Sequence, residues 1–194
     1  MGWLIYGTGE HAKVVIDLLE LLEEKIDYMF DDNYEGGLYE GHPSGKYTED
    51  LFPMANFIIA IGNNADRKKI AEKMSEYKAT SLIHPKSTVS SHTEIGNGTL
   101  ILANAVIQSN VQIGKHCLID ISVNINHDAL IHDYVNIAPT AYIGSETEIG
   151  EGAYIGAGAI ITRGSKIAPW TVIAEGEIYR NEKPLTKSDQ HLNK

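Results

Sequence analysis

The sequence predicts two folding units in series: an α/β Rossmann-like unit over residues 1–80 and a parallel β-helix of hexapeptide repeats over residues 81–178. Two observations lead to this prediction. From Ile83 to Ile173 every sixth residue is isoleucine, with valine once, at position 89. Before that stretch, residues 3–30 read as a strand, a glycine turn, a helix and a second strand, which is typical of an α/β unit. Residues 179–194 are polar and unpatterned, so we expect a C-terminal tail there.

The N-terminal unit begins with an apolar run at residues 3–6. The run leads into Gly-Thr-Gly-Glu-His-Ala, a G-x-G-x-x-A spacing that opens a helix. Further apolar runs predict strands at residues 26–30 and 57–61. A second helix is expected from about residue 65 to residue 77, and residues 33–50, which are polar and rich in glycine, are expected to form a loop. Together these elements predict a small, mostly parallel sheet.

Glycine and polar residues follow the ends of the three expected strands and are candidates for substrate binding. Parallel sheets bind ligands beyond the carboxyl ends of their strands, and a helix N-terminus suits a phosphate or another polar group. A dinucleotide is one alternative. A smaller nucleotide-containing ligand fits better, because the unit is only half the size of a full doubly wound domain. The candidates are Gly9, Glu10, His11, Asp31, Asp32, Gly62 and Asn63.

The six-residue period fits neither the helix, which repeats every 3.6 residues, nor the simple strand, which repeats every two. It is typical of a parallel β-helix, in which each hexad is a short strand and a bend and three hexads close one coil. One inward column would run from Ile83 through Ile101 to Ile173, at the strand spacing of roughly 4.8 Å. Small or short branched residues follow every anchor but the last by four positions, where the coil bends. The single cysteine, Cys117, is one of them, so no disulfide is expected.

Composition excludes several classes of partner. The net charge of −10 argues against nucleic acid, because binding to its phosphates relies on clustered basic side chains. No apolar run reaches the 18 residues that a membrane span needs. The N-terminus has no basic region followed by an apolar core, so no secretory signal is expected and a cytoplasmic location is the simplest interpretation.

Among the eight histidines, His127 is the candidate for chemistry. It lies in an Asn-His-Asp-Ala sequence near the middle of the repeats, two residues after the anchor Ile125, so its side chain is expected to point outward. Asp128 could hold the imidazole by one ring nitrogen and leave the other free as a general base. A solvated coil histidine without a function is the alternative. No role is expected for three other histidines at outward or corner positions of the coils: His84, His92 and His116.

These motifs together resemble one family. They are the N-terminal Gly-x-Gly-x-His-x-Lys-Val-Val, the Asp-Asp after the second strand, the Ala-Ile-Gly-Asn before a helix, the unbroken hexads and the central Asn-His-Asp. Over roughly residues 2–178 this pattern is similar to the NeuD/PglD-type sugar acetyltransferases. The resemblance implies a left-handed β-helix and a homotrimer. It also implies that acetyl-CoA binds in the groove between adjacent β-helices.

The resemblance implies residue roles as well. His127 falls on the family's general base and Asp128 on its acidic neighbour. Gly9, Glu10 and His11 fall on the loop that receives the nucleotide sugar, with Asp31 and Asp32 beside it. A backbone N–H near Gly144 and Ser145, one coil after His127, could stabilise the oxyanion. The positions implied for contact with acetyl-CoA are Asn136, Ser145, Ala157 and Glu175.

The expected function is transfer of an acetyl group from acetyl-CoA to the amino group of a 4-amino-4,6-dideoxy sugar linked to UDP, dTDP or GDP, without a metal. O-acetylation of a sugar, of the sialic acid type, is an alternative that would use the same base. A γ-type carbonic anhydrase-like zinc protein is a further alternative, because His127 and His132 resemble two of its ligands in spacing. The third ligand should come 36 residues before His127, where the sequence has Ser91. A structural or sugar-binding role without catalysis also stays open.

Overall fold

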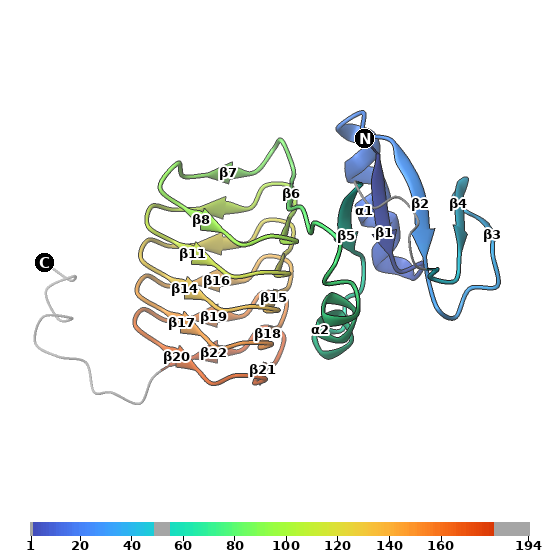
Figure 1. The fold of residues 1–194 in the computed structure, drawn as a ribbon. Coiled ribbons are helices and arrows are strands. Elements are labelled where there is room, and N and C mark those ends of the chain that lie inside the picture. Colours follow the sequence, from blue (N-terminus) through green and yellow to red (C-terminus); the bar gives the residue numbers. More distant parts are fainter. Residues whose placement is uncertain (1, 49–54, 181–194) are drawn as a thin grey trace, which may run out of the picture.

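The computed structural model describes residues 2–48 and 55–180 and places two units side by side (Figure 1). The N-terminal unit holds a five-stranded sheet in the order β3-β4-β2-β1-β5, in which only the β3–β4 pair is antiparallel. Two helices accompany the sheet. In chain order the elements are β1 (Trp3–Tyr6), α1 (Glu10–Leu21), β2 (Ile26–Phe30), β3 (Gly37–Tyr39), β4 (His42–Gly45), β5 (Asn56–Ile59) and α2 (Asn64–Lys73).

The alternation of side chains along β1 divides the N-terminal unit into two cores. Trp3 and Ile5 are buried with the apolar side of α1, whereas Leu4 and Tyr6 are buried with residues of the α2 side such as Met74. Successive residues of a strand point to opposite faces, so one short apolar run serves both cores. The predicted strands and the helix at the glycine turn are therefore present as expected.

The expected loop over residues 33–50 is wrong in part. It contains β3 and β4, and β4 extends the parallel sheet by pairing Met29 with Ser44 and Phe30 with Gly45. The Asp31 N–H also donates to the Gly45 carbonyl at 3.0 Å. Sequence patterns fail here because β3 and β4 are short and are held by main-chain hydrogen bonds, which place little demand on side-chain type.

The C-terminal unit is a left-handed parallel β-helix with three sheets. Every strand pair joins residues 18 positions apart, as in Ile107 with Ile125 and Ile125 with Ile143, which confirms the coil length predicted from the hexads. The strands are β6 (Leu82–Ile83), β7 (Thr88–Val89), β8 (Glu94–Ile95), β9 (Leu100–Ile101), β10 (Val106–Ile107), β11 (Gln112–Ile113), β12 (Leu118–Ile119), β13 (Asn124–Ile125), β14 (Leu130–Ile131), β15 (Asn136–Ile137), β16 (Tyr142–Ile143), β17 (Glu148–Ile149), β18 (Tyr154–Ile155), β19 (Ile160–Ile161), β20 (Lys166–Ile167), β21 (Val172–Ile173) and β22 (Ile178–Tyr179).

The anchors from Ile101 to Ile173 are buried inside the β-helix together with the small residues that follow them. The three anchors of the first coil are less buried, because they lie at the end of the stack: Ile83 has 39% of its surface exposed, and Val89 and Ile95 are half-buried. The third residue after an anchor adopts the left-handed conformation at nine non-glycine positions, with φ between 52° and 62°. The repeat thus fixes the backbone of each corner as well as the inward column.

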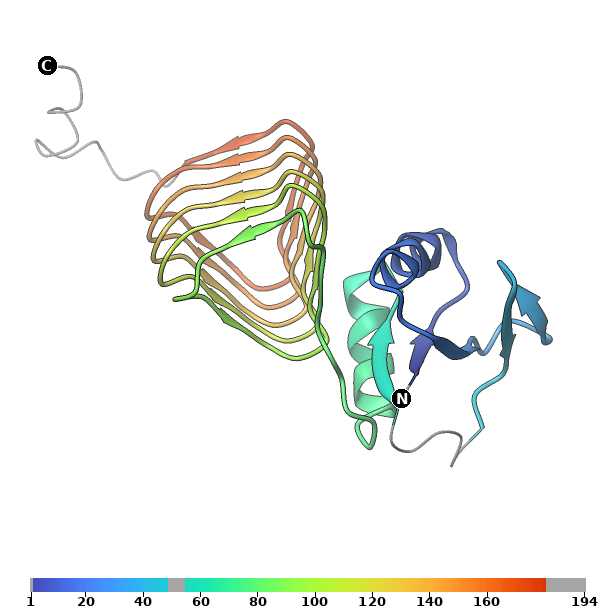
Figure 2. The ribbon, with the colours of Figure 1, turned by 90° about the horizontal axis from the view of Figure 1, so that it is seen from above.

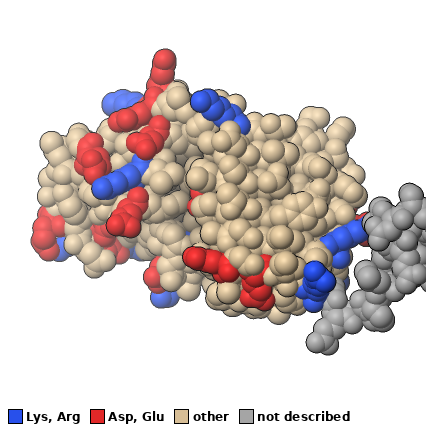
Figure 3. Space-filling model, turned by 180° about the vertical axis from the view of Figure 1, so that it is seen from behind, with Lys and Arg blue, Asp and Glu red and all other residues tan. Residues whose placement is uncertain are grey.

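The three faces of the β-helix have different surroundings. The N-terminal unit lies beside the face of β6, β9 and β12 (Figure 2), where Leu82, Leu100 and Leu118 join the core of α1. A second face, of β7, β10, β13, β16, β19 and β22, presents uncharged residues and is almost free of charge when seen from behind (Figure 3). The third face, of β8, β11, β14, β17 and β20, is polar and carries Glu148 and Lys166, which pair at 2.6 Å.

The expected tail over residues 179–194 lies almost entirely outside the described residues, which end at Arg180. Within the described ranges, no helix has the length and apolar character needed to cross a membrane.

Candidate active site

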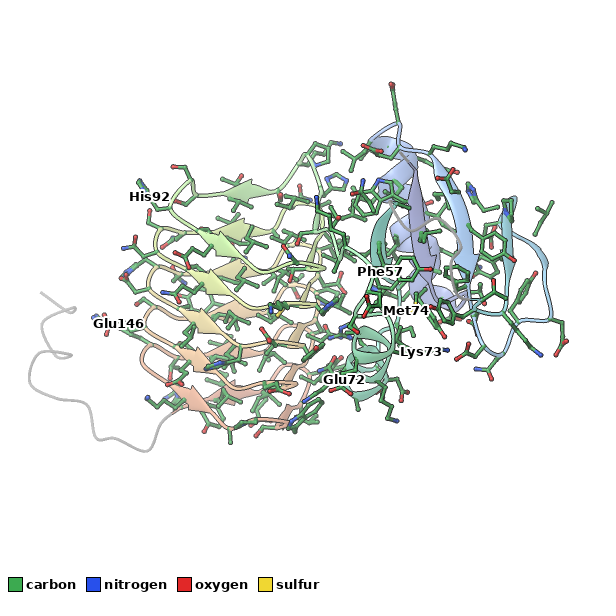
Figure 4. The ribbon with its side chains drawn as sticks, viewed as in Figure 1. Phe57, Glu72, Lys73, Met74, His92 and Glu146 are labelled. Carbon is green, nitrogen blue, oxygen red and sulfur yellow. The ribbon has the colours of Figure 1, made fainter. Side chains whose placement is uncertain are left out.

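Three columns of turns form the corners of the β-helix. The outer corner follows β7, β10, β13, β16 and β19 and contains residues 126–129. The covered corner follows β8, β11, β14, β17 and β20, and the third corner follows β6, β9, β12, β15, β18 and β21. Figure 4 shows the outer corner through His92 and Glu146, which lie on the side of the β-helix away from the N-terminal unit.

His127 lies at the outer corner and is fixed by its neighbour. Its Nδ1 atom is 2.6 Å from the Asp128 Oδ2 atom, and the Asn110 side-chain amide donates to Asp128 Oδ1 at 3.1 Å. The hydrogen bond to His127, and to a smaller extent that from Asn110, lowers the pKa of the Asp128 carboxyl. The group is therefore an anion at neutral pH. An anionic carboxylate can only accept, so His127 Nδ1 carries the proton and Nε2 is left to accept another.

The local backbone explains why this pair forms. Asp128 has a φ of 60°, in the left-handed region that aspartate and asparagine tolerate better than most residues. Its N–H donates to the Ser109 carbonyl at 3.1 Å and thus ties the turn to the coil above. The corner therefore holds the carboxylate next to the imidazole even though half of each side chain is exposed.

A groove with a volume of about 470 Å³ runs from His127 along the two coils above it. Gln108 lies in this groove, and its Oε1 atom accepts from the His127 N–H at 3.2 Å. Since a backbone N–H is a donor, Gln108 must turn its oxygen toward it, which leaves the amide hydrogens on the groove side. The sequence interpretation did not include Gln108. The groove is lined by Thr88, Val89, Ser90, Val106, Ile107, Gln108, Ser109 and His127.

Gly144 and Ser145 lie one coil below His127, as expected from the spacing. The Gly144 N–H already donates to the Ile161 carbonyl at 2.8 Å, and the Glu146 N–H donates to the His127 carbonyl at 3.2 Å. Within the described part of the chain the Ser145 N–H has no such acceptor. Of the two backbone donors considered from the sequence, only that of Ser145 is therefore available to a reacting oxygen.

The other positions implied for acetyl-CoA lie elsewhere in the single chain. Asn136 is on β15, in the sheet that faces the N-terminal unit. Ala157 and Glu175 are in the third corner, in the turns after β18 and β21. One chain therefore does not bring these three residues to His127.

Several candidates for substrate binding already have partners within the N-terminal unit. Asp31 Oδ2 accepts from the N–H and the hydroxyl of Thr8, at 2.9 and 2.8 Å. Asp32 pairs with Lys73 at 2.7 Å, and Asn63 caps helix α2 by accepting from the Asp66 N–H at 3.0 Å. These bonds shape the edge of the sheet. The exposed residues at this edge are Gly9, Glu10, Asp32, Gly62 and Asn63.

His11 has surroundings different from those of the exposed candidates. Burial, and then the charge of Arg67, lower its pKa, whereas Asp120 in the third corner of the β-helix acts in the opposite direction. Its Nε2 atom is buried and has no hydrogen-bond partner among the described residues. His11 thus lies between the glycine turn and the β-helix as a neutral group with an unused ring nitrogen.

His116 lies at a corner, as expected, but it has a structural role that the sequence interpretation did not predict. His116 is at the covered corner but is only 8% exposed, because α2 packs over it. Its ring stacks on that of Tyr134, with centroids 5.6 Å apart, and the Arg67 side chain donates to its carbonyl at 2.8 Å. Sequence reasoning also missed Arg67. The only signal for Arg67 was its position as a cation in the first turns of a helix, where such a side chain is more often solvated.

The two histidines considered for zinc have separate partners. His132 Nε2 lies 3.3 Å from the Glu148 carboxylate on the polar face, whereas His127 pairs with Asp128. The described residues include no group of three or more His, Cys, Asp or Glu side chains that could hold a metal ion.

Family models match both units. The PglD N-terminal domain matches residues 3–74, and the bacterial transferase hexapeptide, described as six repeats, matches residues 92–120. The UDP-N-acetylbacillosamine N-acetyltransferase of Bacillus subtilis (strain 168) is 37% identical over 108 residues, 51% of this chain and 50% of that protein. The matched stretch thus spans about half the length of that curated relative.

Solved structures match over nearly the whole chain. The acetyltransferase domain of PglB from Neisseria gonorrhoeae FA1090 is 30% identical, with a TM-score of 0.86, and the match covers 94% of this chain and 93% of that one. A perosamine N-acetyltransferase from Caulobacter crescentus, in complex with CoA and GDP-perosamine, is 26% identical with a TM-score of 0.86. That match covers 93% of this chain and 90% of the other.

The fold and the corner geometry define a hexapeptide-repeat protein of the acyltransferase class. The chain belongs to the PglD-type family of sugar acetyltransferases. The family and the fold class predicted from the sequence are both confirmed.

Proposed function

We propose that this chain transfers the acetyl group of acetyl-CoA to the amino group of a nucleotide-linked 4-amino-4,6-dideoxy sugar, with His127 as general base. The observation that carries the proposal is the His127–Asp128 pair, which leaves Nε2 of the imidazole free at the end of a groove. The named activities of the relatives support the same class of reaction. The Caulobacter structure also has a histidine replaced by asparagine.

In the proposed step the acceptor amine attacks the thioester carbonyl carbon, a C–N bond forms, the C–S bond breaks and CoA leaves as its thiol. His127 Nε2 takes the proton that the amine loses and can return it to the leaving sulfur. Asp128 holds the ring and stabilises its charged form, and the Ser145 N–H donates to the oxyanion. The chemistry on the chain's side requires no metal and no covalent enzyme intermediate.

We further propose that the active site is completed by a second chain within a homotrimer. His127 lies at the outer corner. Figure 4 shows this corner, through His92 and Glu146, on the side away from the N-terminal unit of the same chain, so an acceptor bound to that unit would be far from His127. The uncharged face next to this corner (Figure 3) exposes Tyr142, Ile160 and Ile178. A neighbouring β-helix packed on this face could bring its third corner, with Ala157 and Glu175, toward His127.

Activity is tested by incubating the purified chain with acetyl-CoA and a panel of UDP-, dTDP- and GDP-linked amino sugars, with free thiol followed over time. The matched acceptors carry a hydroxyl in place of the amino group. We expect thiol release with an amino sugar only. Release with the hydroxyl acceptors would support O-acetylation instead, and no release with any acceptor would contradict the proposed function.

The trimer is tested by sedimentation at micromolar concentration. Ile160→Glu places a charge in the uncharged face and should shift the chain toward monomers, with loss of activity although His127 is intact. Gln112→Glu on the polar face is the matched control and should remain trimeric and active. A wild-type monomer with full activity would exclude the shared site.

A further inference from the structure

Arg67 is a buried cation whose hydrogen bonds connect the two units. It lies in the first turns of α2 and is 1% exposed. On the side of the N-terminal unit its guanidinium donates to the carbonyls of Ile61 and Gly62, each at 3.0 Å, and to Asn64 Oδ1 at 2.8 Å. On the side of the β-helix it donates to the carbonyls of His116 and Tyr134, at 2.8 and 2.9 Å.

Among the described residues, no carboxylate pairs with this guanidinium. Burial lowers the pKa of Arg67 to about 10, which shows how strongly the surroundings disfavour the charge. A buried cation is retained only where its hydrogen bonds are well made, because its desolvation is costly. The planar guanidinium donates to four backbone carbonyl groups in fixed directions, so it sets the position of the two units relative to each other. An apolar contact has no such directionality.

The segments that Arg67 joins are those that the proposed reaction must align. Gly62 and Asn63 lie at the edge of the sheet expected to hold the nucleotide sugar. Tyr134 lies seven residues after His127, in the next corner of the same coil. The charge of Arg67 also acts on His11, at the same edge. A change in the angle between the units would therefore move the acceptor relative to every β-helix in an assembly.

We propose that Arg67 is a positioning residue for the transfer reaction. It fixes the acceptor-binding edge of the N-terminal unit relative to the β-helix, so that a nucleotide-linked amine is presented to a His127 imidazole within reacting distance. This inference rests on the proposed function. A misplacement of about 1 Å at a reacting centre can cost roughly a hundredfold in rate, so a clamp far from the chemistry can govern turnover.

The test compares two acceptors in the wild-type chain and in Arg67→Lys, which keeps the positive charge but lacks the planar guanidinium and its several donors. One acceptor is the nucleotide-linked amino sugar, and the other is the same amino sugar without its nucleotide, which does not depend on the N-terminal unit. For Arg67→Lys we expect kcat with the linked acceptor to fall roughly tenfold to a hundredfold. The KM for acetyl-CoA and the rate with the free amino sugar should stay unchanged.

Two further variants separate positioning from folding. Lys69→Ala is the matched control on the same helix, where it removes an exposed pair with Asp66 that lies within the N-terminal unit, and it should behave as wild type. Asn64→Ala removes the bonds to the carbonyls of Gly152 and Ala153 and should show a smaller loss that is again confined to the linked acceptor. If Arg67→Lys does not fold, the Asn64 variant decides the question.

The outcomes distinguish the two proposals. Suppose that the wild-type chain transfers to the linked acceptor. If Arg67→Lys then loses activity equally with both acceptors, or keeps full activity with both, only the positioning role is overturned. If the wild-type chain transfers to no nucleotide-linked amino sugar, the proposed function fails and this inference fails with it.

Discussion

His116 and His127 lie eleven residues apart, in turns at two different corners of the β-helix, yet they have opposite surroundings. His116 is covered by α2, stacked on Tyr134 and beside Arg67, and burial followed by that charge lowers its pKa to about 4. His127 is half exposed, faces a groove and is paired with an anionic carboxylate. The first histidine is held neutral by its surroundings, whereas the second pairs with an anion and leaves its Nε2 atom open to the groove.

The difference shows what a repeat can and cannot specify. The hexads fix the place of each residue in the coil, because one slip would turn the isoleucines out of the interior. They do not determine what lies against each corner. The N-terminal unit covers one corner and leaves another open, and this contact converts similar turn positions into a structural histidine and a candidate base.

The largest expected effect is on His127. His127→Ala should lower turnover by roughly 10²–10⁴, the usual contribution of a positioned general base. The melting temperature should stay near that of wild type, because an outward coil residue supports no inward column. Steady-state thiol release, with melting recorded alongside, measures both.

His127→Asn should be nearly as inactive, since an amide cannot take up the proton. His132→Asn is the matched control at the covered corner and should remain active. Near-normal turnover by a folded His127→Ala chain would remove the base from the mechanism and leave only positioning and the oxyanion donor.

The next effect concerns stability at acid pH and comes from His116. Its pKa is lower in the folded state than in the unfolded state, so the unfolded chain binds more protons between about pH 6.5 and pH 4. The stability that depends on neutral His116 is therefore complete above that window and is lost as the pH falls through it. One such group costs on the order of 1–2 kcal/mol of unfolding free energy between pH 7 and pH 5.

Melting curves of the wild type and of His116→Asn across this range measure the effect. Asparagine tolerates the left-handed φ of 52° at this position but does not titrate. The comparison therefore isolates His116 from the other groups near it, namely Arg67, Lys115 and Asp133. Parallel pH profiles for the two proteins would contradict the assignment.

The sequence predicted the β-helix well and the contact between the units poorly, for one physical reason. A column of isoleucines buries itself against copies of its own pattern, so the signal repeats sixteen times along the chain. Arg67, by contrast, satisfies its charge with carbonyl groups from distant segments. Carbonyls belong to every residue, so no side chain in the sequence indicates this partner.

The candidate site shows the same division. His127 and Asp128 are neighbours in sequence and were paired correctly, because the turn alone brings them together. Gln108 was missed since it reaches the His127 N–H from one coil above. Gly144 was favoured as a donor equally with Ser145, and only the strand ladder shows that its N–H is used. Whether these residues act in catalysis stays a prediction.

A moderate effect is expected for the carboxylate next to His127. Asp128→Asn keeps the left-handed turn but removes the negative charge. The His127 ring should stay in place, but its protonated form is no longer stabilised by an anion. We expect kcat to fall by about tenfold, less than for His127→Ala, because Asp128 orients the ring through a partly exposed ion pair but does not take up the proton itself. Glu146→Gln, at the equivalent turn one coil below, is the control for loss of a negative charge. A loss as large as that of His127→Ala would give Asp128 a more direct part in the reaction.

The smallest expected effect is on His11, in the N-terminal unit. Its Nε2 atom is buried and unused, at the glycine turn where α1 begins, a place suited to a polar ligand group. His11→Ala should raise the KM for the nucleotide sugar by about fivefold, the equivalent of one hydrogen bond of about 1 kcal/mol, and leave the KM for acetyl-CoA unchanged. His42→Ala is the matched control in the same unit, since that imidazole already lies 3.6 Å from Glu20. If the KM for acetyl-CoA rose instead, the glycine turn would belong to the acetyl donor, and the division of substrates between the two units would have to be reversed.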